Sequence, residues 1–228
     1  MTAPKEPIFA LVLASAVHDM KNSLGMLMGA ISLLNNKYPV KDEDDKQQLS
    51  VFQYEATRLN SALVQLLGLY KIEKQQLTLN YQHHNLEDFV TDSVLQHAPL
   101  LEHSHITANI DVDDELDGFF DGELISSVLS NVIGNSIRYT KTQLLISAFY
   151  DNGIMIQVAD DGPGYPKSML DKHYDFSSCI NAKTGSTGLG LYFAAEIAKL
   201  HIHDGQTGSI KIFNGAPLNG GVFQIKIP

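Results

Sequence analysis

Two apolar seams with heptad spacing occupy the first eighty residues of this 228-residue chain. Within each seam the apolar positions follow one another at intervals of three and four residues, as on the buried side of long packed helices. The seam residues are Leu13, Val17, Met20, Leu24, Leu27, Ile31 and Leu34, followed by Leu49, Phe52, Ala56, Leu59, Leu63, Leu66 and Tyr70. Pro39 and the acidic run 42–45 lie between the seams and favour a helix end followed by a helix start. The pattern predicts an antiparallel helical hairpin.

A lone two-helix hairpin cannot cover both seams. Two copies packed as a four-helix bundle can, so we expect a homodimer. After Gln75 the spacing changes, and helical segments alternate with segments of period two, including a hairpin around residues 151–153. The fold class expected is therefore α+β in two domains, with helices and antiparallel strands mixed in the second.

Charge and composition exclude several functions. The formal net charge is −10 and there is no run of Lys or Arg, which disfavours nucleic acid or an anionic membrane as a partner. The single cysteine, Cys179, excludes an internal disulfide framework. The longest apolar run, residues 8–17, is too short for a membrane span. We expect a cytoplasmic protein with no membrane span and no nucleic-acid partner.

A small, polar stripe runs beside the first seam. It contains Ser15, His18, Asn22, Gly25 and Gly29. His18 follows a seam residue and is expected to be exposed, and a hydrogen bond from its imidazole N–H to Asp19 would fix its tautomer and raise its basicity. Taken alone, the stripe is more simply explained as an ordinary solvated helix face with a surface histidine.

Three segments of the second half suit a nucleotide. In the first, Asn131, Asn135 and Arg138 fall on one helix face, where amide oxygens could meet a metal ion and the guanidinium a phosphate. In the second, Asp160 follows a strand and could accept from an exocyclic amine, with two glycines close by at 162 and 164.

The third segment is Thr187-Gly188-Leu189-Gly190, which opens a helix and exposes amides to an anion. Each segment alone could be a turn or a loop. Their order and spacing together are far more specific.

These segments resemble the catalytic core of a two-component sensor histidine kinase, whose ATP-binding fold is shared by gyrase, Hsp90 and MutL. The matching stretches are 18–22, 131–139, 160–164, 188–191 and the chain ending 201–228. The resemblance implies a dimerisation and histidine-phosphotransfer hairpin in residues 1–80. It also implies a catalytic α/β-sandwich that binds ATP in residues 81–228.

The resemblance assigns roles to individual residues. His18 would be the phosphorylated residue and Asp19 its hydrogen-bonding base. Asn135 would hold Mg²⁺ and Asp160 would bind the adenine amine. Residues that would frame the rest of the ATP site, or the lid from about 174 to 187, are Asn131, Arg138, Gly162, Gly164, Thr187, Gly188 and Gly190.

The expected activity is ATP-dependent phosphorylation of His18, followed by transfer to an aspartate on the receiver domain of a response regulator. A separate sensor protein is the expected source of the signal. The alternative is a phosphotransfer or phosphatase adaptor with a weak ATP domain, in which Asp19 and Asn22 orient a water. A gyrase-type ATP clamp is disfavoured, because such ATPases carry a glutamate base where this chain has Asn131. A pure scaffold would leave the ordered motifs unexplained.

Overall fold

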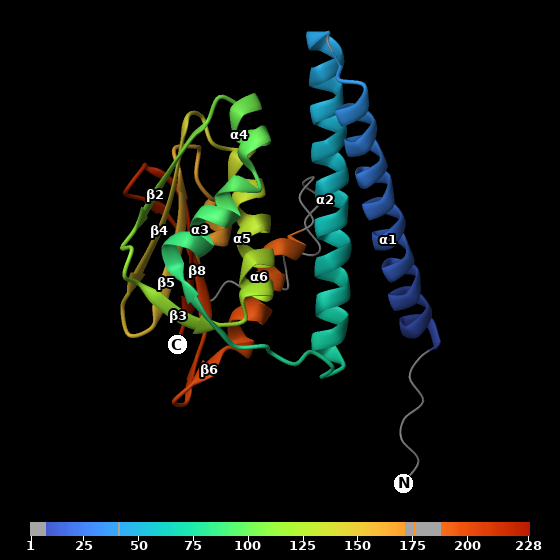
Figure 1. The fold of residues 1–228 in the computed structure, drawn as a ribbon. Helices are drawn as coiled ribbons and strands as arrows, with labels where there is room; N and C mark the ends of the chain where they lie inside the picture. The colour runs from blue at the N-terminus through green and yellow to red at the C-terminus, as the bar shows by residue number, and fades with distance from the viewer. Residues whose placement is uncertain (1–7, 41, 172–175, 177–187) are drawn as a thin grey trace. The chain divides into compact units, whose positions relative to one another are not determined.

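Two long helices and a helix-covered sheet form the two units of the chain (Figure 1). This computed structural model describes residues 8–40, 42–171, 176 and 188–228. The units are Met1–Leu77 and Thr78–Pro228, and each is described by itself. None of the described helices is both long enough and apolar enough to cross a bilayer.

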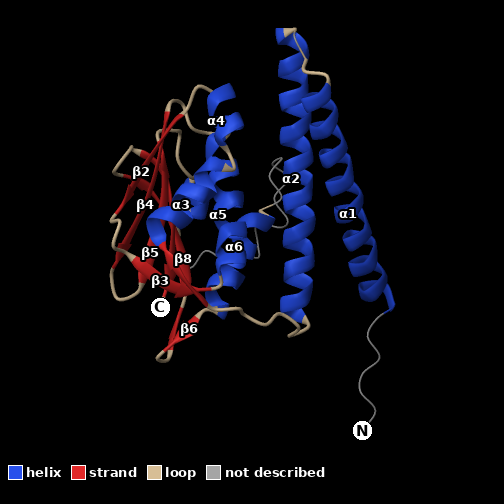
Figure 2. Cartoon of the chain, in the orientation of Figure 1, coloured by secondary structure: helices blue, strands red, loops and turns tan. Residues whose placement is uncertain are grey.

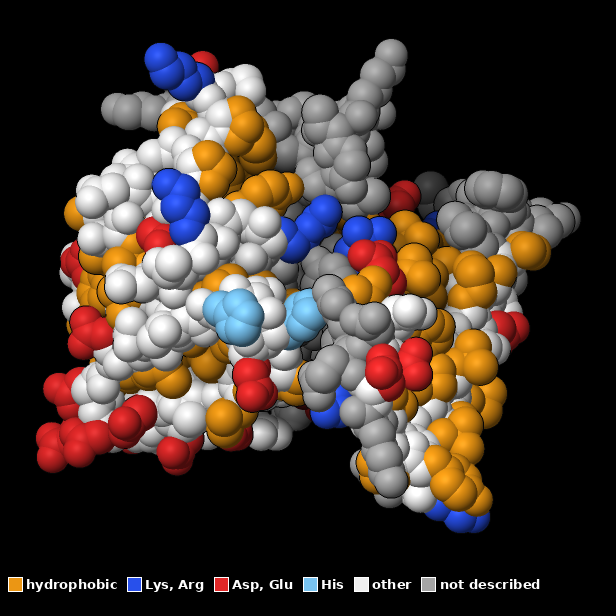
Figure 3. Space-filling view, turned by 90° about the horizontal axis from the view of Figure 1, so that it is seen from above, with side chains coloured by type: hydrophobic (Ala, Val, Ile, Leu, Met, Phe, Trp, Pro, Cys, Tyr) orange, Lys and Arg blue, Asp and Glu red, His pale blue; other side chains and the backbone are white. Residues whose placement is uncertain are grey.

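The first unit is the expected helical hairpin, made of α1 (Ile8–Lys37) and α2 (Glu43–Glu73). Seam residues seven apart behave alike, so each seam divides into two sets. One set is buried or half-buried and consists of Val17, Leu24, Ile31, Leu49, Ala56, Leu63 and Tyr70. The other set is 36–59% exposed and consists of Met20, Leu27, Leu34, Phe52, Leu59 and Leu66. This exposed seam leaves hydrophobic side chains gathered on the helical unit, drawn orange in Figure 3.

The second unit contains a five-stranded sheet in the order β2-β4-β5-β9-β8. Its strands are β2 (Thr107–Val112), β4 (Gln143–Tyr150), β5 (Ile154–Asp160), β9 (Gly220–Ile227) and β8 (Ser209–Gly215). All neighbours pair antiparallel except β2 and β4, which are parallel. The expectation of antiparallel strands throughout is therefore wrong at this pair, because the chain crosses over through a helix before β4 begins.

Helices α3 (Leu86–Leu95), α5 (Gly122–Ile137) and α6 (Leu189–Leu200) cover one face of this sheet (Figure 2). The core between the layers is apolar and almost completely buried, with Leu129, Ile133, Ile146, Ile156, Ile197 and Ile225 all at 0% exposure. The apolar spacing of residues 86–101 predicts a single helix, but α3 ends at Leu95 and a separate α4 (Ala98–His103) follows. Pro99 explains the break, since it has no N–H to continue the hydrogen-bond ladder of α3.

Two short ribbons complete the unit. One joins β1 (Gln82–Asn85) to β3 (Asp117–Phe120), and the other joins β6 (Ile202–His203) to β7 (Gln206–Thr207). The sequence of residues 79–81 predicts a short strand, but the strand observed is β1, which begins at Gln82. Asn80 instead donates its backbone N–H to a carboxylate oxygen of Asp121, at 2.8 Å. A single 3₁₀ turn, η1, covers Lys167–Met169.

Candidate nucleotide and phosphoacceptor sites

The polar face of α5 carries the first group of candidate residues. Val128 and Val132 are buried in the core, so Asn131 lies half-buried and Asn135 and Arg138 are exposed. The side-chain nitrogen of Asn135 donates to the side-chain oxygen of Asn131 at 3.3 Å. Because the nitrogen makes this bond, the carbonyl oxygen of Asn135 is the atom that can coordinate a cation.

Asp160, at the end of β5, is held by the main chain. Its Oδ1 accepts from the backbone N–H of Gly162 at 2.8 Å and from that of Gly221 at 3.1 Å. The residue is only 7% exposed. Two donors on one oxygen fix the orientation of the carboxylate, and they make Oδ2 the oxygen that can accept from a ligand amine.

Glycines allow close backbone approach around this carboxylate. A Cβ at Gly162 would collide with the carbonyl oxygen of Tyr139, which follows α5, and a Cβ at Gly220 would collide with the backbone of Asp160. Gly164 has a φ of +77°, and the side chain of Asn214 pairs with both backbone polar groups of the next residue. The end of α5, the loop after β5 and the start of β9 therefore pack without side chains between them.

Asp161 and Tyr165 flank this loop. Asp161 accepts from the backbone N–H groups of Lys141 and Thr142, at 2.7 and 3.1 Å, and from the Thr142 hydroxyl at 2.7 Å. Although desolvation acts to raise its pKa, these hydrogen bonds lower the pKa to about 2. Burial, with the charge of Asp160, raises the pKa of Tyr165, so the phenol stays neutral beside the carboxylate.

The start of α6 meets α5 at its amide face. Gly188 caps the helix with a φ of +60°, a conformation that glycine adopts without strain. A Cβ at Gly190 would collide with the side chain of Asn131. The structure thus brings the third sequence segment against the first. Thr187 lies outside the described residues, as does the predicted lid apart from Phe176.

His18 lies on α1 with its side chain 58% exposed. Its Nδ1 is 3.3 Å from the amide nitrogen of Asn22 and 3.7 Å from a carboxylate oxygen of Asp19. The first distance allows a hydrogen bond and the second is too long for one. The ring therefore turns Nδ1 toward these two side chains. A Cβ at Gly25 or Gly29 would touch nothing within 4 Å, so the stripe beyond His18 is open.

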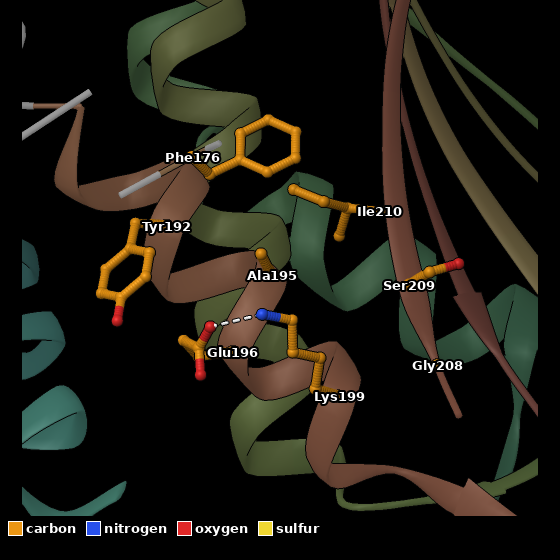
Figure 4. A pocket seen from close by; sticks show the side chains of 8 residues that line it. All are labelled: Phe176, Tyr192, Ala195, Glu196, Lys199, Gly208, Ser209 and Ile210. Carbon is orange, nitrogen blue, oxygen red and sulfur yellow. Dashed lines mark hydrogen bonds and ion pairs between the residues drawn. The ribbon is translucent and has the colours of Figure 1, made fainter. Parts of the chain in front are cut away.

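Two pockets among the described residues of the second unit lie elsewhere. One, of about 260 Å³, lies between α6 and the start of β8. It is lined by Phe176, Tyr192, Ala195, Glu196, Lys199, Gly208, Ser209 and Ile210, with an ion pair of 2.7 Å between Lys199 and Glu196 (Figure 4). Another, of about 550 Å³, lies over β4 next to Pro217. Neither is lined by a predicted nucleotide residue, so the nucleotide assignment rests on the polar groups described above.

Sequence reasoning missed several residues of this region. Gly220, Gly221 and Asn214 support the loop around Asp160, and Asp161 ties that loop to the chain after α5. The glycine pair at the start of the last strand was an available signal, because glycine within a strand marks close backbone approach.

Comparison with known proteins gives consistent relatives. Residues 120–228 match the family described as histidine kinase-, DNA gyrase B-, and HSP90-like ATPase. The sensor histidine kinase TmoS of Ectopseudomonas mendocina is 24% identical over 223 residues, which cover 94% of this chain and 22% of TmoS. The sensor protein KdpD of Escherichia coli K12 is 25% identical over 232 residues, covering 100% of this chain and 25% of KdpD. The chain thus spans about a quarter of the length of these relatives.

Solved structures show the same fold. The Acinetobacter baumannii histidine kinase AdeS has a TM-score of 0.57 and 21% identity, covering 92% of this chain and 96% of that one. Full-length ShkA in complex with AMPPNP has a TM-score of 0.64 and 20% identity, covering 95% and 45%. The α+β fold class expected from the sequence, with an ATP-binding sandwich after the helices, is confirmed.

Proposed function

We propose that the chain phosphorylates its own His18 from ATP. Residues 120–228 match the family described as histidine kinase-, DNA gyrase B-, and HSP90-like ATPase, and most of the chain is similar to sensor histidine kinases. One observation carries the proposal most directly. Asn131, which accepts a hydrogen bond from Asn135, is packed against Gly190 on α6, so two separate motifs lie in contact.

The nucleotide would lie across these groups. Asp160 accepts from the adenine amine through Oδ2, while Gly162 and Gly164 let the base approach the backbone. Arg138 faces the phosphates, and the amides after Thr187, at Gly188 and Gly190, point at an anion in front of α6. Asn131 positions Asn135 through their hydrogen bond.

Mg²⁺ fits the oxygen of Asn135. This ion is commonly bound through one or two protein oxygens, with substrate phosphates and waters completing its shell. Once bound, it neutralises charge on the phosphates. Asn135 would hold the ion and orient the phosphate chain, and the exposed position of its side chain leaves room for those waters.

His18 would then act through Nε2. Asn22 donates its amide N–H to Nδ1 and so keeps the ring proton on Nε2; this hydrogen bond must break and the proton must move to Nδ1, toward Asp19, before Nε2 has a lone pair to offer. The Nε2 lone pair bonds to the γ-phosphorus while the bond from that phosphorus to the bridging oxygen breaks, and ADP leaves with the electron pair. The proton on Nδ1 passes to the carboxylate of Asp19 once the 3.7 Å gap closes. The phosphoryl group would next move to an aspartate of a response-regulator receiver domain, and we propose the cytoplasm as the compartment of the reaction.

Asn131 separates this proposal from an ATP clamp. A gyrase-type hydrolase needs a carboxylate base at this position to activate water. The side-chain amide of an asparagine cannot act as a base and take a proton from water near neutral pH. The chain would therefore keep ATP for transfer to His18 rather than for hydrolysis.

The test is incubation of the full chain with γ-labelled ATP and Mg²⁺. The proposal requires protein-bound label that is lost in acid and retained in alkali, the stability expected of a phosphoramidate. Label that survives acid would point to a hydroxyl acceptor instead and would contradict the proposal.

A second copy of the chain is the partner we propose for the exposed seam of α1 and α2, giving a four-helix bundle. Leu27→Asp should convert the dimer to a monomer, since each Leu burial contributes about 1.5–3 kcal/mol and a symmetric dimer loses two. Sedimentation velocity measures the change. Leu33→Asp is the matched control, because Leu33 is 71% exposed but lies outside the seam. A wild-type chain that sediments as a folded monomer would rule the bundle out.

Asn22 supports an additional phosphatase activity, because its amide lies one turn from His18 and 3.3 Å from Nδ1. From there it can hold a water in line with a docked aspartyl phosphate. Asn22→Ala should retain self-phosphorylation while the phosphorylated regulator decays at least about tenfold more slowly. Decay is followed on purified phospho-regulator, with Ser23→Ala as the neighbouring control. Equal decay rates for wild type and Asn22→Ala would exclude this role.

A further inference from the structure

A buried carboxylate outside the proposed sites, Asp121, joins three parts of the second unit. It is 5% exposed. Its Oδ1 accepts from the backbone N–H of Leu124 at 3.1 Å, which caps α5, and its Oδ2 accepts from the N–H of Asn80 at 2.8 Å. Its own N–H donates to Nε2 of His201 at 3.2 Å. One residue thus holds the segment before β1, the first turn of α5 and the residue that ends α6.

His201 is held in the tautomer that this arrangement needs. It is fully buried, and its Nδ1 lies 3.0 Å from the carbonyl oxygen of Ile197, to which it donates. Nε2 is then the acceptor for the N–H of Asp121. Desolvation lowers the pKa of His201, against smaller opposing effects of the Ile197 carbonyl and of Asp121, so the ring stays neutral.

A second set of contacts joins the segment before β1 to the end of α6. The hydroxyl of Tyr81 accepts from the backbone N–H of Ile202 at 3.3 Å, just after α6. The Tyr81 ring also packs edge-on against His201, with ring centroids 5.6 Å apart. Residues 78–81, here called the connecting segment, are therefore bound both at the start of α5 and at the end of α6.

Both helices lead to the proposed nucleotide site. α5 carries Asn131 and Asn135, and Gly190, in the first turn of α6, is packed on Asn131. The connecting segment is the first stretch of the second unit and directly follows the helical hairpin in the chain. A displacement of this segment would therefore be carried by two packed helices to the amide pair.

We propose that Asp121 is a positioning residue that couples the connecting segment to α5 and α6 and thereby sets the rate of phosphoryl transfer to His18. This inference rests on the proposed function. Asp121 touches neither substrate nor acceptor, so its loss acts on turnover rather than on ATP affinity.

The test uses Asp121→Asn in the full chain. The asparagine oxygen still caps α5, since asparagine is as good an N-cap as aspartate, but the amide nitrogen cannot accept from Asn80. We expect kcat for self-phosphorylation to fall at least tenfold, with ATP affinity within twofold of wild type. Hydrogen exchange at the Asn80 amide should become faster in the same variant.

Two further variants separate coupling from general destabilisation. Asn85 caps α3 in the same way, because its Oδ1 accepts from the Asp88 N–H at 3.0 Å. Asn85→Ala removes this cap and should lower the unfolding free energy while kcat stays at the wild-type value. Tyr81→Phe keeps the ring and removes only the hydroxyl tether, so it should lower kcat severalfold at constant ATP affinity. Tyr81→Phe also tests the coupling if Asp121→Asn does not fold.

The outcomes distinguish the two proposals. A wild-type kcat in both Asp121→Asn and Tyr81→Phe overturns the coupling, as does a fall in ATP affinity that matches the fall in kcat. If the wild type takes no label, the proposed function fails. The coupling is then tested by hydrogen exchange at the Asn80 amide. Because coupling between two sites is reciprocal, ATP should slow this exchange in the wild type but not in Asp121→Asn. Equal slowing in both overturns it.

Discussion

His18→Ala should abolish incorporation of phosphate from ATP while leaving the affinity for ATP unchanged. The side chain supplies the nitrogen that forms the new bond, and the other residues of its stripe, Ser15, Asn22, Gly25 and Gly29, carry no imidazole. The proposed nucleotide groups belong to the other unit of the chain, so their geometry does not depend on this ring. The loss should exceed about a thousandfold, the size typical of removing a catalytic nucleophile. Acid-labile label after incubation with γ-labelled ATP measures the first effect, and calorimetric titration with an ATP analogue the second.

His203→Ala provides a matched control for this experiment. His203 is also exposed, at 72% of its side chain, and its Nε2 lies 3.6 Å from the neighbouring carboxylate of Asp204. It therefore reproduces the local chemistry of His18 and Asp19 at a place with no proposed role. The control should label like the wild type. Acid-labile label in His18→Ala would show that another histidine is the acceptor.

Asp160→Asn should weaken ATP binding by about 10- to 140-fold. The loss of a hydrogen bond to a charged group costs about 1.5–3 kcal/mol, and each 1.4 kcal/mol changes an affinity tenfold. The asparagine oxygen can still accept from Gly162 and Gly221, so the loop keeps its anchor. The new amide nitrogen would face the adenine amine, and because both groups are donors no hydrogen bond forms between them. The variant thus removes the ligand contact and spares the fold, which Asp160→Ala would not.

Asp161→Asn is the control for that variant, one residue along the chain. Its carboxylate holds the chain after α5 through Lys141 and Thr142. It should lower the unfolding free energy and leave ATP affinity within a few-fold of wild type. Both variants are titrated with an ATP analogue and unfolded in urea. Wild-type affinity in Asp160→Asn would place adenine elsewhere.

The spacing of apolar residues and glycines in the sequence predicted several helices, because a helix depends on residues close together in the chain. The heptad spacing predicted the two helices of the hairpin, and the glycine segment predicted the helix that it opens, observed as α6 (Leu189–Leu200). Pro99 was a visible helix breaker, but the apolar spacing across residues 86–101 masked it. The split of each seam into a buried and an exposed set needed the structure, because spacing alone does not say which heptad positions face the neighbouring helix.

Long-range contacts could not be predicted in this way. The Asp121 bonds reach residues 41 and 80 positions away, and nothing in the neighbouring sequence marks a lone aspartate before a helix as more than a cap. The parallel pairing of β2 with β4 likewise depends on where the intervening helix packs. The motifs around Asn131, Asp160 and Gly190 were predictable individually, whereas the contact of Gly190 with Asn131 is a property of the folded unit.

Because of the exposed seam on α1 and α2, the stability of the hairpin would depend on the concentration of the protein in the cell. If a second copy covers that seam, unfolding of the hairpin also separates two chains, so the unfolding equilibrium obeys mass action in total protein. Each tenfold dilution then lowers the apparent unfolding free energy by about 1.4 kcal/mol per dimer. Expression level would set how much of the hairpin is folded before any signal arrives, and a melting temperature would have meaning only beside the concentration at which it was measured.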